Sequence, residues 1–198
     1  MALSVVLLDA NVLIPLDPRD TILRAAQSGL CQVHWTEQIL AETERNLPKL
    51  LKDEDEAERR VKAVRLITAL RTAFPGAPIT GYESAISRMT NDPSDRHVVA
   101  AAAFARVDAI VTFNIKHFPP AALAPFHLRA VEPDDFLVEL FASAPDTFAA
   151  ILRKQEVVRI RPKRTATEIL AGMETRMPRF VGAMRQRLAE ESPGSLMS

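Results

Sequence analysis

Acidic residues at the ends of apolar, strand-like runs are the part of this sequence best suited to chemistry. Asp9 directly follows the apolar run 5–8. Asp92 and Asp95 lie at the start of a helical pattern over 93–106. Carboxylates that converge without a cysteine cluster select hard cations such as Mg²⁺ or Mn²⁺, and two such ions can clamp an in-line phosphoryl displacement. These acids therefore predict metal-dependent chemistry on a phosphate or a phosphodiester.

Each of these acids, taken singly, also has a structural interpretation. Asp9 could cap the turn that follows it. Asp92 precedes Pro93 and could cap the helix, and Asp95 could favour the positive end of the helix dipole. The chemical interpretation therefore depends on several acids meeting in one place.

Short apolar runs that alternate with helical patterns predict the elements that position these acids. The expected strands cover residues 5–8, 32–35, 78–82, 109–113 and 128–131. The expected helices cover residues 19–28, 37–52, 54–73, 93–106 and 133–143. This alternation is typical of an α/β fold with three layers, in which a central parallel sheet of about five strands has helices on both faces. Ligands of such sheets bind beyond the carboxyl ends of the strands, where Thr112 and Asn114 would join the acids.

Helix starts are marked by capping residues. Thr36 is expected to cap the helix that follows the second strand, and Asp53 with Glu56 forms a pair similar to a capping box. The apolar positions of the segment 54–73 recur at helical spacing and are expected to pack on the sheet. These positions are Ala57, Val61, Val64, Ile67 and Leu70.

The composition is that of a globular protein, with 198 residues, 47% hydrophobic and 25% charged, and no net charge. Zero net charge excludes a chain coated in lysine and arginine for nonspecific nucleic-acid binding. The charge is uneven, because residues 1–150 carry 15 basic and 20 acidic side chains whereas residues 151–198 carry 10 basic and 5 acidic ones. We expect an α/β domain over 1–143 and a basic helical C-terminal extension over 144–198. Its expected helices cover 146–156, 166–174 and 178–191, with a basic connector at 157–164.

The sequence also indicates the cellular compartment of the protein. No stretch approaches the roughly 18 apolar residues of a membrane span, and Asp9 interrupts an N-terminus that lacks the basic start of a secretory signal. The one cysteine, Cys31, excludes an internal disulfide and a cysteine-rich zinc site. A cytoplasmic protein is therefore expected.

Four segments resemble, in order and spacing, the motifs of PIN-domain ribonucleases, and the VapC-type toxins of bacterial toxin–antitoxin pairs are the most similar group. The segments are LLDANVLI at 7–14, ILAETERNL at 39–47, NDPSDRHVVAAAA at 91–103 and IVTFNIKHF at 110–118. The resemblance covers residues 3–135. It implies a three-layer PIN-like fold and a metal-dependent endoribonuclease, with Mg²⁺ or Mn²⁺ held at the carboxyl edge of the sheet.

The resemblance also assigns roles to residues. The implied metal ligands are four acids: Asp9, Glu42, Asp95 and, as an auxiliary acid, Asp92. Asn114 stands where relatives carry Asp or Asn, and as an amide it could orient water in place of binding the metal. Asn11 and Thr112 would support the ligands without touching the ion. His117 lies where many relatives have an acidic residue, so no role transfers to it.

Only the resemblance favours Glu42 over Glu44 as a metal ligand. On a helical wheel Glu42 and Glu44 flank opposite edges of the apolar face, and Glu44 is slightly nearer to it. Asp95 is expected to tilt toward the sheet, whereas Arg96 and His97 point elsewhere. No metal-binding role is expected for His97.

The implied partners are RNA, a cognate antitoxin and a second copy of the chain. Basic residues must position a polyanion beside an acidic site, and Arg96 and Lys116 are the candidates near it. An antitoxin segment would enter the acidic cleft. The helices at 37–73 are the expected homodimer surface.

Three other functions compete with this one, and the sequence argues against the first two. A haloacid-dehalogenase-like phosphatase would need a second Asp two residues after Asp9, but Asn11 stands there. A receiver domain would need paired acids before the first strand's Asp, and the N-terminus has no room for them. A catalytically degenerate PIN-like binding module is the third, and the amide of Asn114 leaves it open.

Overall fold

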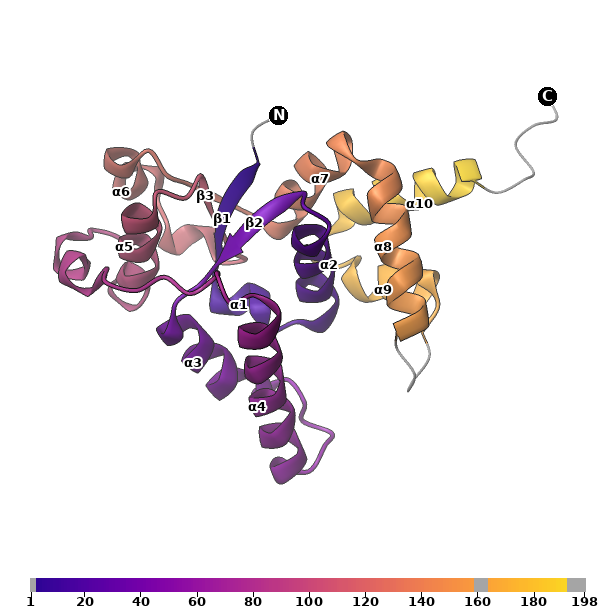
Figure 1. The fold of residues 1–198 in the computed structure, drawn as a ribbon, viewed down its shortest axis with the longest axis horizontal. Helices are drawn as coiled ribbons and strands as arrows, with labels where there is room; N and C mark the ends of the chain where they lie inside the picture. The colour runs from indigo at the N-terminus through magenta and orange to yellow at the C-terminus, as the bar shows by residue number, and fades with distance from the viewer. Residues whose placement is uncertain (1–2, 159–163, 192–198) are drawn as a thin grey trace. The chain divides into compact units, whose positions relative to one another are not determined.

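The computed structural model describes residues 3–158 and 164–191 (Figure 1). The chain divides into two compact units, residues 1–16 with 32–132 and residues 17–31 with 133–198, and each is described by itself. The expected boundary after residue 143, between an α/β domain and a helical extension, stays a prediction. Residues 159–163, most of the predicted basic connector, lie outside the described residues.

The first unit is built on a four-stranded sheet. Its strands are β1 (Ser4–Leu8), β2 (Cys31–His34), β3 (Ala109–Val111) and β4 (Arg129–Val131), in the order β2-β1-β3-β4. β1 pairs with β3 in parallel, with Leu7 opposite Ile110, and β3 pairs with β4 in parallel. All three residues of β3 are fully buried, as are Val6, Leu7 and Leu8 of β1. The predicted α/β fold with a parallel central sheet is confirmed.

The expected strand over 78–82 forms only a single bridge, between Trp35 and Pro78. Trp35 N–H donates to Ala77 O at 3.2 Å, and Ile79 N–H donates to Trp35 O at 2.8 Å. Pro78 has no N–H to extend this ladder, and Gly81 turns the chain away with a φ of 83°. The expected count of about five strands was therefore one too many.

Helices flank the sheet in the first unit (Figure 1). They are α1 (Ala10–Leu13), α3 (Glu37–Asn46), α4 (Glu56–Ala73), α5 (Arg96–Ala105) and α6 (Pro120–Leu123). Thr36 caps α3 as predicted, because its hydroxyl accepts the N–H of Ile39 at 3.1 Å. The predicted cap at Asp53 was wrong, since the carboxylate of Asp55 caps α4 by accepting the N–H of Ala57 at 2.9 Å.

The apolar face of α4 is only partly covered. α4 lies beside α3 and buries Ala63, Ile67 and Leu70 (Figure 1). Val61 is 46% and Val64 52% exposed, and Ala57 is exposed as well, so the expectation that these three pack on the sheet was wrong. α3 covers one row of side chains on the surface of α4, and the two valines lie outside that row.

The second unit is helical. It contains α2 (Leu16–Gln27), α7 (Pro133–Ser143), α8 (Pro145–Val158), α9 (Ala166–Met173) and α10 (Pro178–Glu191). Phe148 and Phe180 pack edge to face in its core, with ring centroids 5.4 Å apart. The three helices predicted after residue 144 are confirmed. None of the described helices of either unit has the length and apolarity to cross a membrane.

A glycine in α9 makes room for a largely buried ion pair. Arg164 Nη1 donates to both carboxylate oxygens of Asp17 at 2.9 and 2.8 Å, and Asp17 is 7% exposed. A Cβ on Gly172 would lie 2.7 Å from Arg164 Nη2 and would also collide with Asp17 Oδ2. Gly172→Ala should therefore lower the free energy of unfolding by about 1–3 kcal/mol, measured by urea denaturation.

The matched control for Gly172→Ala is Gly182→Ala in α10, where a Cβ would meet nothing within 4 Å. Alanine stabilises an open helical position by up to about 1 kcal/mol relative to glycine, so this variant should gain stability. Equal gains at both positions would contradict the role of Gly172.

Candidate active site

Asp9 lies at the carboxyl end of β1, beside the end of β3. Its N–H donates to Val111 O at 3.1 Å and so extends the pairing of the two strands. Thr112 follows β3, and its N–H donates to Val131 O of β4 at 3.0 Å. Asp9 is 4% exposed and makes no side-chain cap to α1, so the structure does not support the capping interpretation.

Two neighbouring polar side chains hold the Asp9 carboxylate. The hydroxyl of Thr112 and the amide nitrogen of Asn11 both donate to Asp9 Oδ2 at 2.7 Å. Asn11 is itself held because its Oδ1 accepts the N–H of Phe113 at 3.0 Å. These contacts fix the orientation of the carboxylate and set Asn11 and Thr112 beside Asp9.

The charge balance around Asp9 is unfavourable without a cation. Burial raises the pKa of Asp9 to about 6, the hydrogen bond from Thr112 opposes this rise, and repulsion by Asp95 and Glu42 adds to it. Acids that destabilise one another's charge in this way suit a divalent cation, which would invert the local preference for protons. The donor set therefore fits the oxygen-loving metal expected from the sequence.

Asp92 precedes and caps a short 3₁₀ turn, Pro93–Asp95, which ends at Asp95 and leads into α5. Asp92 Oδ1 accepts the N–H of Ser94 at 3.0 Å, and the hydrogen bonds from Ser94 lower the pKa of Asp92. The Ser94 hydroxyl lies 2.6 Å from Asp92 Oδ1 and 2.9 Å from Asp95 Oδ2. Asp92 is therefore the cap that its position before Pro93 predicted, and it also stands next to Asp95.

His117 joins this pair of acids, although its position in the sequence indicated no role. Its Nδ1 lies 2.7 Å from Asp95 Oδ2 and 2.7 Å from the amide nitrogen of Asn114. One ligand atom from each of Asp92, Asp95 and His117 can be chosen so that all three lie within 4.8 Å of one another. The 3₁₀ turn Ile115–His117 brings the imidazole here, and the only signal in the sequence is the spacing of three residues from Asn114.

Glu42 on α3 faces a buried histidine. Glu42 Oε1 lies 3.2 Å from Nε2 of His97, which is 3% exposed and has no aligned hydrogen-bond partner for either ring nitrogen among the described residues. Burial would raise the pKa of Glu42, but the interaction with His97, aided by Gln38 and Arg45, lowers it below its ordinary value. His97, which was expected to point elsewhere than Asp95, is buried and lies against Glu42 of α3.

Comparison with known proteins is consistent with this geometry. A family model described as the PIN domain matches residues 5–116. The chain belongs to the PIN-domain family. A second model, the VapC50 C-terminal domain, matches residues 133–186. The chain is 34% identical over 145 residues to a protein of Mycobacterium tuberculosis (strain ATCC 25618 / H37Rv) with the curated name "Putative ribonuclease VapC50", an alignment that covers 70% of this chain and 86% of that protein. No solved structure matches.

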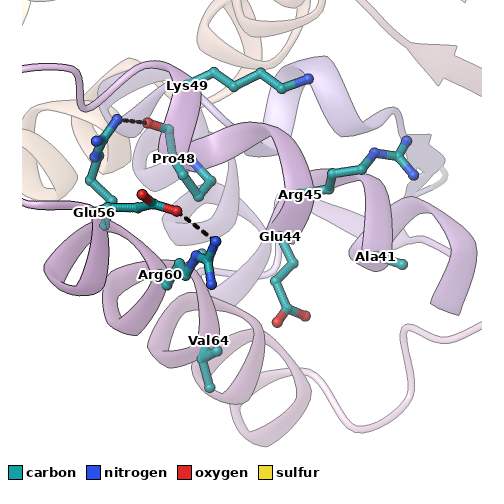
Figure 2. Close-up of a pocket in the computed structure, with 10 residues that line it drawn as sticks. Ala41, Glu44, Arg45, Pro48, Lys49, Glu56, Arg60 and Val64 are labelled. Carbon is teal, nitrogen blue, oxygen red and sulfur yellow. Dashed lines mark hydrogen bonds and ion pairs between the residues drawn. The ribbon is translucent and has the colours of Figure 1, made fainter.

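Within the PIN domain, the structure separates Glu42 from Glu44. A surface groove of ≈ 750 Å³ lies between α3 and α4, and Glu44 lines it while Glu42 does not (Figure 2). Arg45 and Lys49 line the same groove, and Arg60 pairs with Glu56 there at 2.5 Å (Figure 2). The two glutamates, which a helical wheel places at opposite edges of the apolar face, therefore face different surroundings.

The two basic residues expected near the PIN-domain acids differ in their surroundings. Arg96 is half-buried, and its Nε donates to Asn91 O at 3.3 Å. Lys116 is exposed and adjoins His117 on the same turn. Lys116 is therefore the better placed of the two to meet a phosphate in solution.

Proposed function

We propose that this protein is a VapC-type endoribonuclease that uses Mg²⁺ or Mn²⁺ to hydrolyse RNA phosphodiester bonds. The observation that carries the proposal is the group of acids around the carboxyl end of β1, where Asp95 and Glu42 repel the charge of buried Asp9. The name of the relative from Mycobacterium tuberculosis supports RNA as the substrate.

The proposed metal ligands are Asp9, Glu42 and Asp95, with Asp92 as an auxiliary acid. A bound divalent ion would supply a more acidic water and neutralise charge on the phosphate. The chain's own part is to hold the ligands: Thr112 and Asn11 fix Asp9, and His97 faces Glu42. Asn114 is proposed to orient polar groups in the site, since its amide nitrogen already lies against His117.

The proposed partners follow from the same relationship. An RNA substrate would meet Lys116 and Arg96, and a cognate antitoxin would enter the acidic site, in the cytoplasm where the RNA lies. A homodimer through the helices at 37–73 stays a prediction, supported by the exposure of Val61 and Val64. Sedimentation velocity of the purified chain measures whether it is a monomer or a dimer.

Cleavage of RNA with and without metal tests the proposal. The purified chain should cut single-stranded or structured RNA in Mn²⁺ or Mg²⁺ and leave 5′-phosphate ends. EDTA should stop the reaction, and Mn²⁺ in excess should restore it. Cleavage that continues undiminished in EDTA would contradict the proposal.

The alternative is a PIN-like module that binds RNA without cutting it, which the amide at Asn114 favours. RNA binding in Mn²⁺ with no cleavage of any RNA would identify it. The phosphatase alternative has no support, because Asn11 donates a hydrogen bond to Asp9 where that mechanism needs an acid.

A further inference from the structure

Among the residues that the structure describes, His117 is the one imidazole placed beside both Asp92 and Asp95. Asp95 Oδ2 lies 2.7 Å from its Nδ1, and a donor atom of Asp92 completes a set within 4.8 Å. The imidazole is 28% exposed and the Asp95 side chain 16%, so a cation from solvent could reach both.

His117 Nδ1 lies between two polar groups. Asp95 Oδ2 and the side-chain amide of Asn114 each lie 2.7 Å from this nitrogen. The amide can turn about its Cβ–Cγ bond to present either its oxygen or its nitrogen, so it fits either protonation state of the imidazole. When Nδ1 carries no proton, its lone pair and the Asp95 carboxylate are two electron-pair donors side by side, and one cation could accept from both.

We propose that His117 is a metal ligand, so that Asp92, Asp95 and His117 form a mixed carboxylate–imidazole site for Mn²⁺ or another transition-metal ion. This inference rests on the proposed metal-dependent function and specifies the class of metal ion that the site prefers. Mg²⁺ favours oxygen donors almost exclusively, whereas imidazole suits first-row transition metals. His117 therefore determines metal preference, and an oxygen donor at this position would favour Mg²⁺.

Electron paramagnetic resonance on the full chain loaded with Mn²⁺ tests this directly. A histidine ligand couples its ¹⁴N nucleus to the ion, and spin-echo envelope modulation detects that coupling without any activity measurement. We compare the wild-type chain with His117→Asn and His117→Asp. The matched control is His127→Asn, which removes an exposed imidazole at a left-handed position (φ 55°) that asparagine tolerates. Circular dichroism verifies that each variant is folded.

The ¹⁴N modulation should be present in the wild type and in His127→Asn and absent from both His117 variants. His117→Asn should weaken Mn²⁺ binding by about 10-fold or more while Mg²⁺ binding changes little, and His117→Asp should shift the preference toward Mg²⁺. Mn²⁺ bound without ¹⁴N modulation in a wild type that cleaves RNA would overturn the role of His117 and leave the nuclease proposal standing. Modulation that persists in His117→Asn would also overturn it. A wild type that binds no Mn²⁺ would overturn both.

Discussion

Asp9→Asn is expected to lower metal-dependent RNA cleavage by roughly 1,000-fold, because the variant loses the most buried carboxylate of the proposed metal site. A metal ion contributes several kcal/mol to the stabilisation of a phosphoryl transition state, and each 1.36 kcal/mol is about tenfold in rate. Asparagine keeps the shape of the residue, and its Oδ1 can still accept from Thr112 and Asn11. The effect therefore isolates the lost charge.

The same variant should stabilise the metal-free protein. Burial raises the pKa of Asp9 to about 6 from an ordinary value of 3.8, so the folded state binds the proton more tightly than the unfolded state. Stability is then higher at low pH and falls as the pH rises from about 4 through about 6. At neutral pH the ionised Asp9 carboxylate lowers the free energy of unfolding by about 3 kcal/mol, at about 1.4 kcal/mol per pKa unit. Asp9→Asn should restore most of this stability.

Urea denaturation at pH 4 and pH 7.5 in EDTA measures this effect. The difference between wild type and Asp9→Asn should be small at pH 4 and large at pH 7.5. Asp53→Asn is the control, because Asp53 is exposed and should change neither stability nor cleavage. An Asp9→Asn protein that is less stable than wild type at pH 7.5, or that cleaves RNA normally, would contradict the placement of Asp9.

Glu42→Gln should lower RNA cleavage at least about 100-fold, whereas Glu44→Gln should leave it unchanged. The two residues lie on the same helix, yet Glu42 faces His97 near Asp9 and Glu44 lines the groove against α4. Loss even of a residue that supports a metal ligand typically costs 10–100-fold, so loss of the ligand itself should cost at least the upper end of that range.

Metal titration distinguishes a lost ligand from a damaged fold in the Glu42 variant. The affinity for Mn²⁺ should fall in Glu42→Gln and stay at the wild-type value in Glu44→Gln, with matching thermal melts. Equal losses of cleavage in the two variants would show that the helix and not the Glu42 carboxylate is what matters.

The sequence by itself determined the features that depend on short stretches of chain. The apolar run before Asp9 predicted a buried strand, the alternation of strands and helices predicted the parallel sheet, and Pro93 predicted the cap at Asp92. The motif spacing indicated the PIN family, which the family model then confirmed. These features were predictable because backbone propensity, capping and strand burial are set by neighbouring residues.

Only the tertiary structure decided which side chains meet. Val61 and Val64 stay exposed because α4 lies against α3, and no periodicity within α4 names its neighbour. Glu42 has His97 beside it only because α5 lies close to α3, and this contact is what distinguishes Glu42 from Glu44. His117 reaches Asp95 across 22 residues because two short 3₁₀ turns converge. Contacts between distant segments depend on the packing of whole elements, so a local pattern could place the acids at the sheet edge but could not specify the histidines that face them.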